Sequence, residues 1–199
     1  MVDLSRYPKK VKVKGGETIV LRILAPTDEK ELARFLAELP PEERLYFRDD
    51  VSNPRTVHQW CHNIDLNRVI PLVALQGERI VGDMTLHLQE HGWMRHLAEI
   101  RGVVKPELRR CGLGTAMIYE MLSIAQSLEL ERAVLELVKP QQRALMHFTS
   151  IGFGVEAVLK NWVRDFNGET QDLLLLSTGI EPAWRRMEEM VLDSDLGGQ

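Results

Sequence analysis

The stretch 99–117, EIRGVVKPELRRCGLGTAM, constrains the fold of this chain more than any other. It has the pattern of a strand, a turn that contains proline, and a helix start that carries two glycines. Because Gly112 and Gly114 have no side chain, successive backbone N–H groups of the turn and of the first helical turn can point at one anion. The positive end of the helix dipole lies at the same place. The stretch therefore predicts a strand–turn–helix unit with an anion-binding site.

Arg109 and Arg110 bring positive charge to this turn, although the chain as a whole is acidic, with 25 Lys and Arg against 29 Asp and Glu. A general nucleic-acid binder carries the opposite excess, so we exclude that class. The glycine spacing also excludes the phosphate loop, which ends in Lys-Ser/Thr, and the dinucleotide fingerprint, which needs three glycines. We therefore expect the anion to be a diphosphate.

The chain has 199 residues, a length that fits one domain with a full core. Two cysteines, Cys61 and Cys111, exclude a disulfide framework and indicate a reducing compartment. No apolar run is long enough to span a bilayer, and the N-terminal residues lack the apolar core of a signal peptide. We expect a cytoplasmic protein, monomer or homodimer, with no membrane and no nucleic-acid partner.

The remaining pattern predicts an α/β (α+β) domain whose mixed, mostly antiparallel sheet is flanked by helices. A hairpin over 9–24 precedes a helix after Pro26, a second helix over 54–68, and strands within 71–76, 79–89 and 96–104. A long helix buries Leu113, Met117, Met121, Ile124 and Leu128. The sheet is completed by strands over 131–138, 153–164 and 170–177. Between the first two of these strands, Pro140 starts a helix whose inward-facing residues are Ala144, Leu145 and Phe148. We assign 1–179 to the domain, with its core at 17–178, and 180–199 to a terminal helix and tail whose Trp184, Met187, Met190 and Val191 pack on the domain itself.

Two motifs carry a resemblance to a known family. The residues Arg109-Arg110-Cys111-Gly112-Leu113-Gly114 fit the Arg/Gln-x-x-Gly-x-Gly/Ala signature of the GNAT-type N-acetyltransferases, between the strand and the long helix. Further along, QQRALMHFTSIGF at 141–153 is similar to the Asn-x-x-Ala…Tyr-x-x-x-Gly-Phe pattern of that family. The chain resembles the family over about 17–178.

The resemblance implies an acyl transfer from acetyl-CoA to an amine, with no metal. Backbone amides of the stretch Arg109, Arg110, Cys111, Gly112, Leu113, Gly114 and Thr115 would hold the pyrophosphate of the coenzyme. The backbone of Val103 and Val104 would pair with the pantetheine arm, and an N–H group there would stabilise the oxyanion. A glycine inside a strand, here Gly102, marks a bulge or a close backbone approach.

Amine acylation also needs a base, because an alkylammonium group must lose a proton before it attacks. Some members of the family place a catalytic glutamate where Glu99 stands, so Glu99 is our candidate general base. Arg101 lies on the same face of the strand and would hold Glu99 ionised if the two paired. The alternatives are a water relayed from Glu136 or from His96.

The sequence departs from the family where a tyrosine usually protonates the leaving thiolate, because Phe148 stands there, and Gln141 replaces the usual asparagine. A thiol with a pKa near 8.5 can leave without full protonation. Tyr46, Tyr119 and His147 are the remaining acid candidates, and the general acid stays open.

A metal is not expected, although His58, Cys61 and His62 have the i, i+3, i+4 spacing of metal ligands on a helix, because no fourth ligand lies nearby. Acceptor contacts are expected from residues 38–60 and from the last two strands. That segment combines acidic residues with aromatic ones, which suits a cationic amine and equally suits a solvated surface: Glu42, Glu43, Asp49, Asp50, Tyr46, Phe47 and Trp60.

The leading hypothesis is an N-acetyltransferase that moves an acetyl group from acetyl-CoA to a primary amine by direct attack in a ternary complex. The acceptor is a small amine or a protein lysine, and the Leu-Pro-Pro-Glu-Glu stretch, similar to bacterial protein-lysine acetyltransferases, favours the lysine. A noncatalytic acyl-CoA sensor is the alternative, because of Phe148. An interaction protein with a vestigial fold is the third hypothesis.

Overall fold

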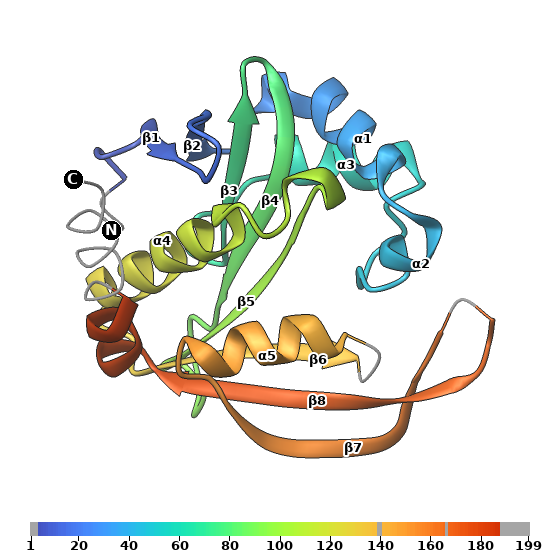
Figure 1. The fold of residues 1–199 in the computed structure, drawn as a ribbon, viewed down its shortest axis with the longest axis vertical. Coiled ribbons are helices and arrows are strands. Elements are labelled where there is room, and N and C mark those ends of the chain that lie inside the picture. Colours follow the sequence, from blue (N-terminus) through green and yellow to red (C-terminus); the bar gives the residue numbers. More distant parts are fainter. Residues whose placement is uncertain (1–3, 139–140, 166, 188–199) are drawn as a thin grey trace. The chain divides into compact units, whose positions relative to one another are not determined.

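The computed structural model describes residues 4–138, 141–165 and 167–187. The elements in chain order (Figure 1) are β1 (Lys9–Lys12), β2 (Thr18–Ile23), the 3-10 turn η1 (Pro26–Asp28), α1 (Glu29–Glu38), α2 (Pro41–Arg44), α3 (Pro54–His62), β3 (Val69–Gln76), β4 (Arg79–Leu88), β5 (Leu97–Val104), the 3-10 turn η2 (Pro106–Leu108), α4 (Leu113–Ser127), β6 (Arg132–Val138), α5 (Gln142–Ser150), β7 (Gly154–Arg164) and β8 (Thr170–Gly179).

The strands are hydrogen-bonded in the order β1-β2-β3-β4-β5-β6-β8-β7. Strand β5 pairs with β6 in parallel, whereas β1 to β4 pair in sequence as antiparallel neighbours and β8 is antiparallel to both β6 and β7. The predicted α/β class with a mixed, mostly antiparallel sheet is confirmed. The N-terminal hairpin is confirmed too, and Lys10 and Lys12 form the exposed face of its edge strand.

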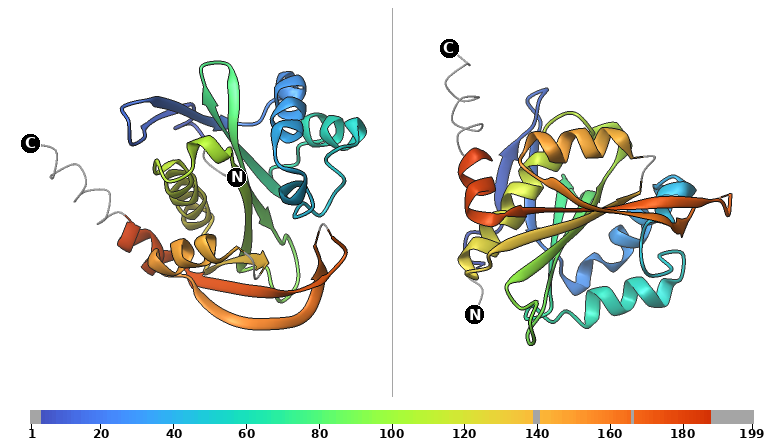
Figure 2. Two further views of the ribbon diagram at one scale, coloured as in Figure 1. Left: turned by 45° about the vertical axis from the view of Figure 1, so that its right-hand side comes forward. Right: turned by 90° about the horizontal axis from the view of Figure 1, so that it is seen from below.

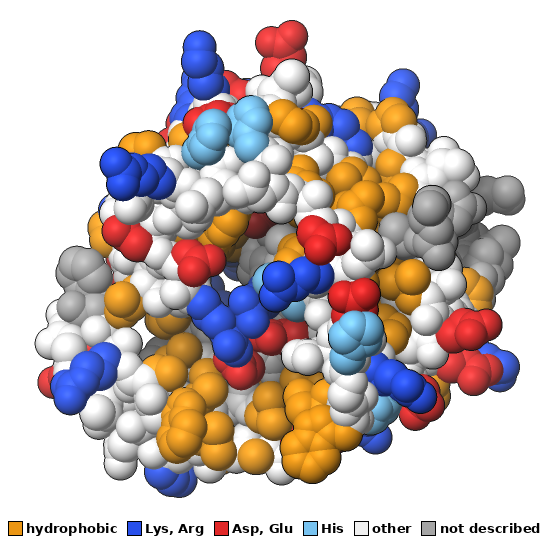
Figure 3. Space-filling view, turned by 180° about the vertical axis from the view of Figure 1, so that it is seen from behind, with side chains coloured by type: hydrophobic (Ala, Val, Ile, Leu, Met, Phe, Trp, Pro, Cys, Tyr) orange, Lys and Arg blue, Asp and Glu red, His pale blue; other side chains and the backbone are white. Residues whose placement is uncertain are grey.

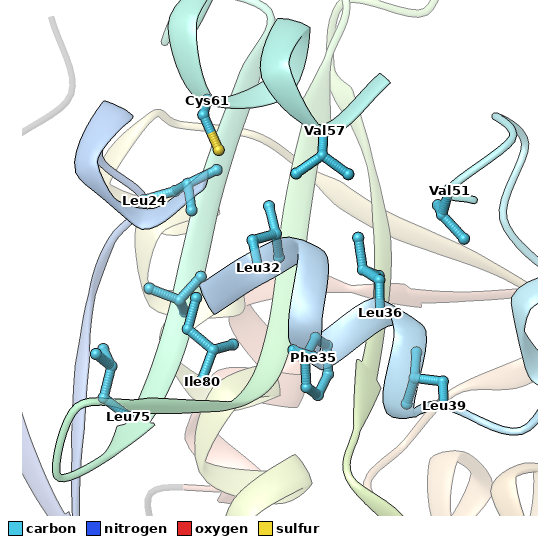
Figure 4. Packing of buried hydrophobic residues seen from close by; sticks show 11 residues of the cluster. Leu24, Leu32, Phe35, Leu36, Leu39, Val51, Val57, Cys61, Leu75 and Ile80 are labelled. Carbon is cyan, nitrogen blue, oxygen red and sulfur yellow. The ribbon is translucent and has the colours of Figure 1, made fainter. Parts of the chain in front are cut away.

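The chain divides into two compact units, one made of Met1–His87 with Arg101–Ile118 and the other of Leu88–Ile100 with Tyr119–Gln199. Strand β5 and helix α4 each pass from one unit to the other. In the first unit, helices α1 and α3 pack on β2, β3 and β4 through a buried cluster (Figure 4). The members of this cluster are Leu24, Leu32, Phe35, Leu36, Leu39, Val51, Val57, Cys61, Val73, Leu75 and Ile80.

In the second unit, α5 lies alongside β8 and β7 (Figures 1 and 2). Residues 180–187 are helical, and the Trp184 ring stacks on Tyr119 of α4 with the ring centroids 6.4 Å apart. Met187 is buried. The described part of the terminal helix therefore packs on its own chain, as expected, while Met190 and Val191 lie outside the described residues.

Three sequence expectations differ from the structure. Helix α3 ends at His62 because the Asp65 carboxylate caps a turn by accepting from the Asn67 N–H, at 3.0 Å, in place of further helical hydrogen bonds. Leu128 follows the end of α4 and is half-buried. The inward residues of α5, Ala144, Leu145 and Phe148, are half-buried too. Pro140 lies outside the described residues.

No helix among the described residues is long and apolar enough to cross a membrane. On the face shown in Figure 3, acidic and basic side chains are interspersed rather than gathered by sign.

Candidate functional site: the turn before helix α4

The turn between β5 and α4 is built around two unusual backbone conformations. Arg110 has a φ of 64°, in the left-handed region that non-glycine residues rarely adopt, and Gly112 has a φ of 91°. These two residues bend the chain sharply enough for α4 to start at Leu113. The turn is anchored from outside, because the Lys14 N–H donates to the Cys111 carbonyl at 2.8 Å.

The first turn of α4 supplies backbone donors. The Ala116 N–H donates to the Gly112 carbonyl at 3.0 Å, so the helical ladder begins there. The N–H groups of Gly112, Leu113 and Gly114 precede that bond and have no intrahelical acceptor. A Cβ at Gly112 would meet no atom within 4 Å, so open space lies beside Gly112 at the start of the helix. With the helix dipole, this geometry fits a phosphate or diphosphate.

The two arginines of the turn have different surroundings. The Arg109 guanidinium donates to Oε1 of Glu43 at 2.8 Å and also to the other carboxylate oxygen, and its Nε donates to the Val104 carbonyl at 3.0 Å. Arg110 is exposed. Arg109 therefore fixes the turn against α2 and β5, and Arg110 has its charge available for a ligand.

The close backbone approach expected at Gly102 is confirmed. A Cβ there would lie 2.8 Å from the Asp83 carbonyl and 2.9 Å from Cγ of Met84, both on β4. Since real Cβ atoms do not approach so closely, only glycine lets β5 run this near to β4. Gly102 therefore fixes the course of the strand that leads into the turn.

The candidate base Glu99 lies on β5 in the second unit and is half-buried, as is Arg101 in the first unit. Among the described residues, three residues of β5 pair with β6, namely Leu97, Ala98 and Glu99, so Glu99 is the last of them. From Ile100 on, the strand follows β4 toward the turn. Val103 and Val104 thus belong to the part of β5 outside that register.

The structure shows the contacts of Phe148 and of the three residues considered as the general acid. Phe148 packs edge-on against Phe153, with the ring centroids 5.5 Å apart, and Tyr119 stacks on Trp184. Burial lowers the pKa of the adjacent His147. Tyr46 is exposed.

Sequence reasoning missed two features of the first unit. Glu43, expected on the acceptor side, pairs with Arg109, and only the acidic run 42–43 hinted at such a partner. Asp83, in the middle of β4, is 5% exposed, and burial raises its pKa to about 7. Phe47 and Trp60, also expected on the acceptor side, contact each other with ring centroids 6.2 Å apart.

A strand, a glycine-bearing turn and a helix start with unpaired N–H groups form the arrangement by which many α/β proteins bind an anion. The acetyltransferase (GNAT) family model matches residues 32–153, which is more than half of the chain. The chain therefore belongs to the GNAT acetyltransferase family, as the two sequence motifs indicated. The coenzyme that this family uses, acetyl-CoA, contains a diphosphate.

Solved structures share the fold. Mycobacterium smegmatis RimJ, in complex with CoA-disulfide, is similar with a TM-score of 0.74 and 18% identity over 92% of this chain and 95% of that one. A GNAT-family acetyltransferase from Streptococcus pneumoniae has a TM-score of 0.71 and 21% identity, covering 81% and 99% of the two chains. The GNAT domain of S. lividans PAT has a TM-score of 0.68 and 17% identity, covering 86% and 96%. No curated protein sequence matches the chain at a significant level.

Proposed function

We propose that this protein is an N-acetyltransferase that moves an acetyl group from acetyl-CoA to a primary amine by direct attack in a ternary complex. The observation that carries the proposal is the turn before α4, where Arg110 and Gly112 adopt left-handed conformations and open space lies beside Gly112 at the helix start. The first N–H groups of the helix and the Arg110 side chain hold the diphosphate of the coenzyme. Membership of the family supplies the reaction class.

Strand β5 supplies the remaining groups. Its end, Val103 and Val104, lies beyond the register with β6, so a backbone edge of the strand is available to pair with the pantetheine arm. An N–H group of this edge stabilises the negative charge that develops on the thioester oxygen. Glu99 takes the proton of the ammonium group, the amine nitrogen bonds to the carbonyl carbon, and the C–S bond breaks to release the thiolate. The half-buried position of Glu99 supports its role as the base.

The acceptor that we propose is a lysine on a protein. The second unit exposes large apolar side chains on α5 and β7, namely Met146 (64% exposed), Val155 (45%), Val158 (45%) and Trp162 (65%). A pocket of about 450 Å³ lies beside them between α5, β7 and β8, with Lys160 and Asp172 on its wall. A surface of this kind suits a macromolecular partner better than a small amine.

The test measures thiol release from acetyl-CoA with a panel of small amines, spermidine, and folded proteins that carry lysine. We expect release with the proteins. Trp162→Ala should raise the KM for a protein acceptor several-fold and leave the KM for a small amine unchanged. Equal effects on both acceptors would contradict the acceptor class.

Two further variants test the machinery. Gly112→Asp places bulk and negative charge in the diphosphate site, so the affinity for CoA should fall by more than tenfold. If that affinity survives, the turn is not the site. Glu99→Gln should lower kcat by about 10²-fold or more at neutral pH, since general base catalysis contributes 10²–10⁴-fold. An unchanged kcat would remove Glu99 as the base.

A noncatalytic acyl-CoA sensor is the second candidate, favoured by one observation. Phe148 stands where the family usually has a tyrosine, and it packs against Phe153 with no group that can donate a proton. Tight binding of acetyl-CoA with no thiol release above background over the whole panel would support the sensor. The absence of any rise in Tm with acetyl-CoA would contradict both candidates.

A further inference from the structure

Helices α1 and α3 bring three potential metal ligands together on the surface of the first unit. Glu29 is the first residue of α1, and His58 and His62 lie one turn apart on α3. Oε2 of Glu29 lies 3.2 Å from Nδ1 of His58 and 3.0 Å from Nε2 of His62. The three ligand atoms lie within 4.8 Å of one another. His58 and His62, which lie far from Glu29 in the sequence, thus meet at one oxygen of its carboxylate.

The structure changes the ligand set that the sequence offered. Cys61 shares the helical spacing of the two histidines, but its side chain is fully buried in the cluster under α1 and α3. Because its thiol lies in this cluster under the two helices and not with the exposed ligand atoms, Cys61 is not part of the ligand set. Glu29 takes the place that Cys61 would have had. Two imidazoles and one carboxylate form a ligand set typical of zinc sites with an open position.

The geometry suits a transition metal. Bonds of about 2.0–2.1 Å to nitrogen and oxygen give a ligand–ligand separation of about 2.9 Å in an octahedron and about 3.3 Å in a tetrahedron. The two distances from Glu29 to the imidazole nitrogens, 3.2 Å and 3.0 Å, fall in this interval, and the two imidazole nitrogens lie within 4.8 Å of each other. The imidazole rings are stacked, with their centroids 4.3 Å apart, so both present a nitrogen to the same carboxylate.

Rigid neighbours hold the ligands in place. Asp28, next to Glu29, is buried and paired with Arg22 at 2.5 Å, and it accepts from the Ala25 N–H at 2.8 Å. On α3, Val57 and Cys61 are buried beside the two exposed histidines. Because each ligand adjoins a fixed core residue, an ion can bind without the cost of ordering a loop.

We propose that Glu29, His58 and His62 form a binding site for a divalent transition-metal ion of the Zn²⁺ type, which links α1 to α3 at the surface and leaves at least one coordination position for water. The carboxylate and two neutral imidazoles contribute one negative charge, which partly offsets that of the ion. The site is separate from the turn before α4 and requires no part in acetyl transfer.

The test uses the full chain without a histidine tag, treated with a chelator and then titrated with Co²⁺ and with Zn²⁺. Visible absorption reports the Co²⁺ coordination, and the rise in Tm with Zn²⁺ reports binding to the folded state. We expect a single site in the unaltered protein. His62→Ala and Glu29→Gln should each weaken binding by at least about tenfold, since even outer partners of a ligand contribute 10–100-fold.

His91→Ala is the matched control. His91 is highly exposed and lies 3.9 Å from a single carboxylate, that of Glu90, so it represents an ordinary surface histidine. The control should bind Co²⁺ like the unaltered protein. The proposal is overturned if no Co²⁺ absorption band and no rise in Tm are observed, or if His62→Ala and His91→Ala bind equally well. Circular dichroism confirms that the variants are folded, and Glu29→Gln keeps the shape of the side chain.

Discussion

Arg109 donates both terminal nitrogens of its guanidinium to the carboxylate of Glu43, which stands 66 residues earlier in the chain. The Arg109 Nε holds the Val104 carbonyl as well. One side chain therefore connects α2, the end of β5 and the turn before α4. The signature arginine of the family thus supports the turn through ion pairing and hydrogen bonding, whereas the neighbouring Arg110 is exposed.

Because Arg109 and Glu43 support the turn only as a pair, we expect Glu43→Gln and Arg109→Ala to have the same effects. Each should lower the free energy of unfolding by about 0.5–1 kcal/mol, because the pair is partly exposed and solvent screens it. Each should also weaken binding of CoA, because the turn loses its support. Urea unfolding and calorimetric titration with CoA measure the two effects. Tighter binding of CoA by Glu43→Gln would instead mean that Arg109, once released, holds the phosphate itself.

Arg110 has a strained backbone conformation and a charge that we propose contacts the diphosphate. Replacing Arg110 with glycine relieves the strain and removes the charge, so stability and binding should change in opposite directions. Arg110→Gly should raise the free energy of unfolding by up to about 1 kcal/mol, since glycine adopts a φ of 64° without steric cost. The same variant should bind CoA about tenfold more weakly or worse, because a charge-assisted hydrogen bond contributes about 1.5–3 kcal/mol. Arg110→Ala is the control, with the charge removed and the strain kept. Binding by Arg110→Gly that equals the original would rule out a role for the charge.

The two glycines of the turn differ in how far their backbone conformation requires glycine. Gly112 has open space around it but a φ of 91°, so Gly112→Ala should cost about 1–2 kcal/mol of stability through backbone strain alone. At Gly114, an added Cβ would lie an ordinary 3.9 Å from Val104, and the backbone is helical, so Gly114→Ala should be neutral or stabilising. Urea unfolding of the two variants checks the contrast. Equal losses at both positions would show that space, not conformation, limits the turn.

Local patterns predicted the elements and the turn well, because each depends on residues close together in the sequence. The spacing of Leu113, Met117 and Met121 predicted the buried face of α4, and the glycines predicted where this helix begins. The pairing of Arg109 with Glu43 and the meeting of Glu29 with His62 depend on tertiary packing, and no local pattern encodes either. The sequence predicts a helix to residue 68, whereas α3 ends six residues earlier, at His62, because the capping of a turn by Asp65 outweighs helix propensity.

Asp83 illustrates a group whose properties arise from the fold alone. Its position on β4 leaves it only 5% exposed, and this burial raises its pKa to about 7. Between about pH 4 and pH 7 the folded protein therefore keeps a proton that the unfolded chain releases. The free energy of unfolding must fall as the pH rises through this window, by a few kcal/mol in all.

Asp83→Asn should remove that part of the pH dependence and make the protein more stable at pH 8, where the carboxylate would otherwise be buried with its charge. Asp28→Asn is the contrasting control. Although burial of Asp28 disfavours its charge, hydrogen bonds from Arg22 and Ala25 lower its pKa, so the stability that it contributes is present above about pH 4 and lost as the pH falls. Asp28→Asn should therefore destabilise the protein at neutral pH. Urea unfolding from pH 4 to pH 8 distinguishes the variants, and an Asp83→Asn protein that kept the original slope would show that another group causes it.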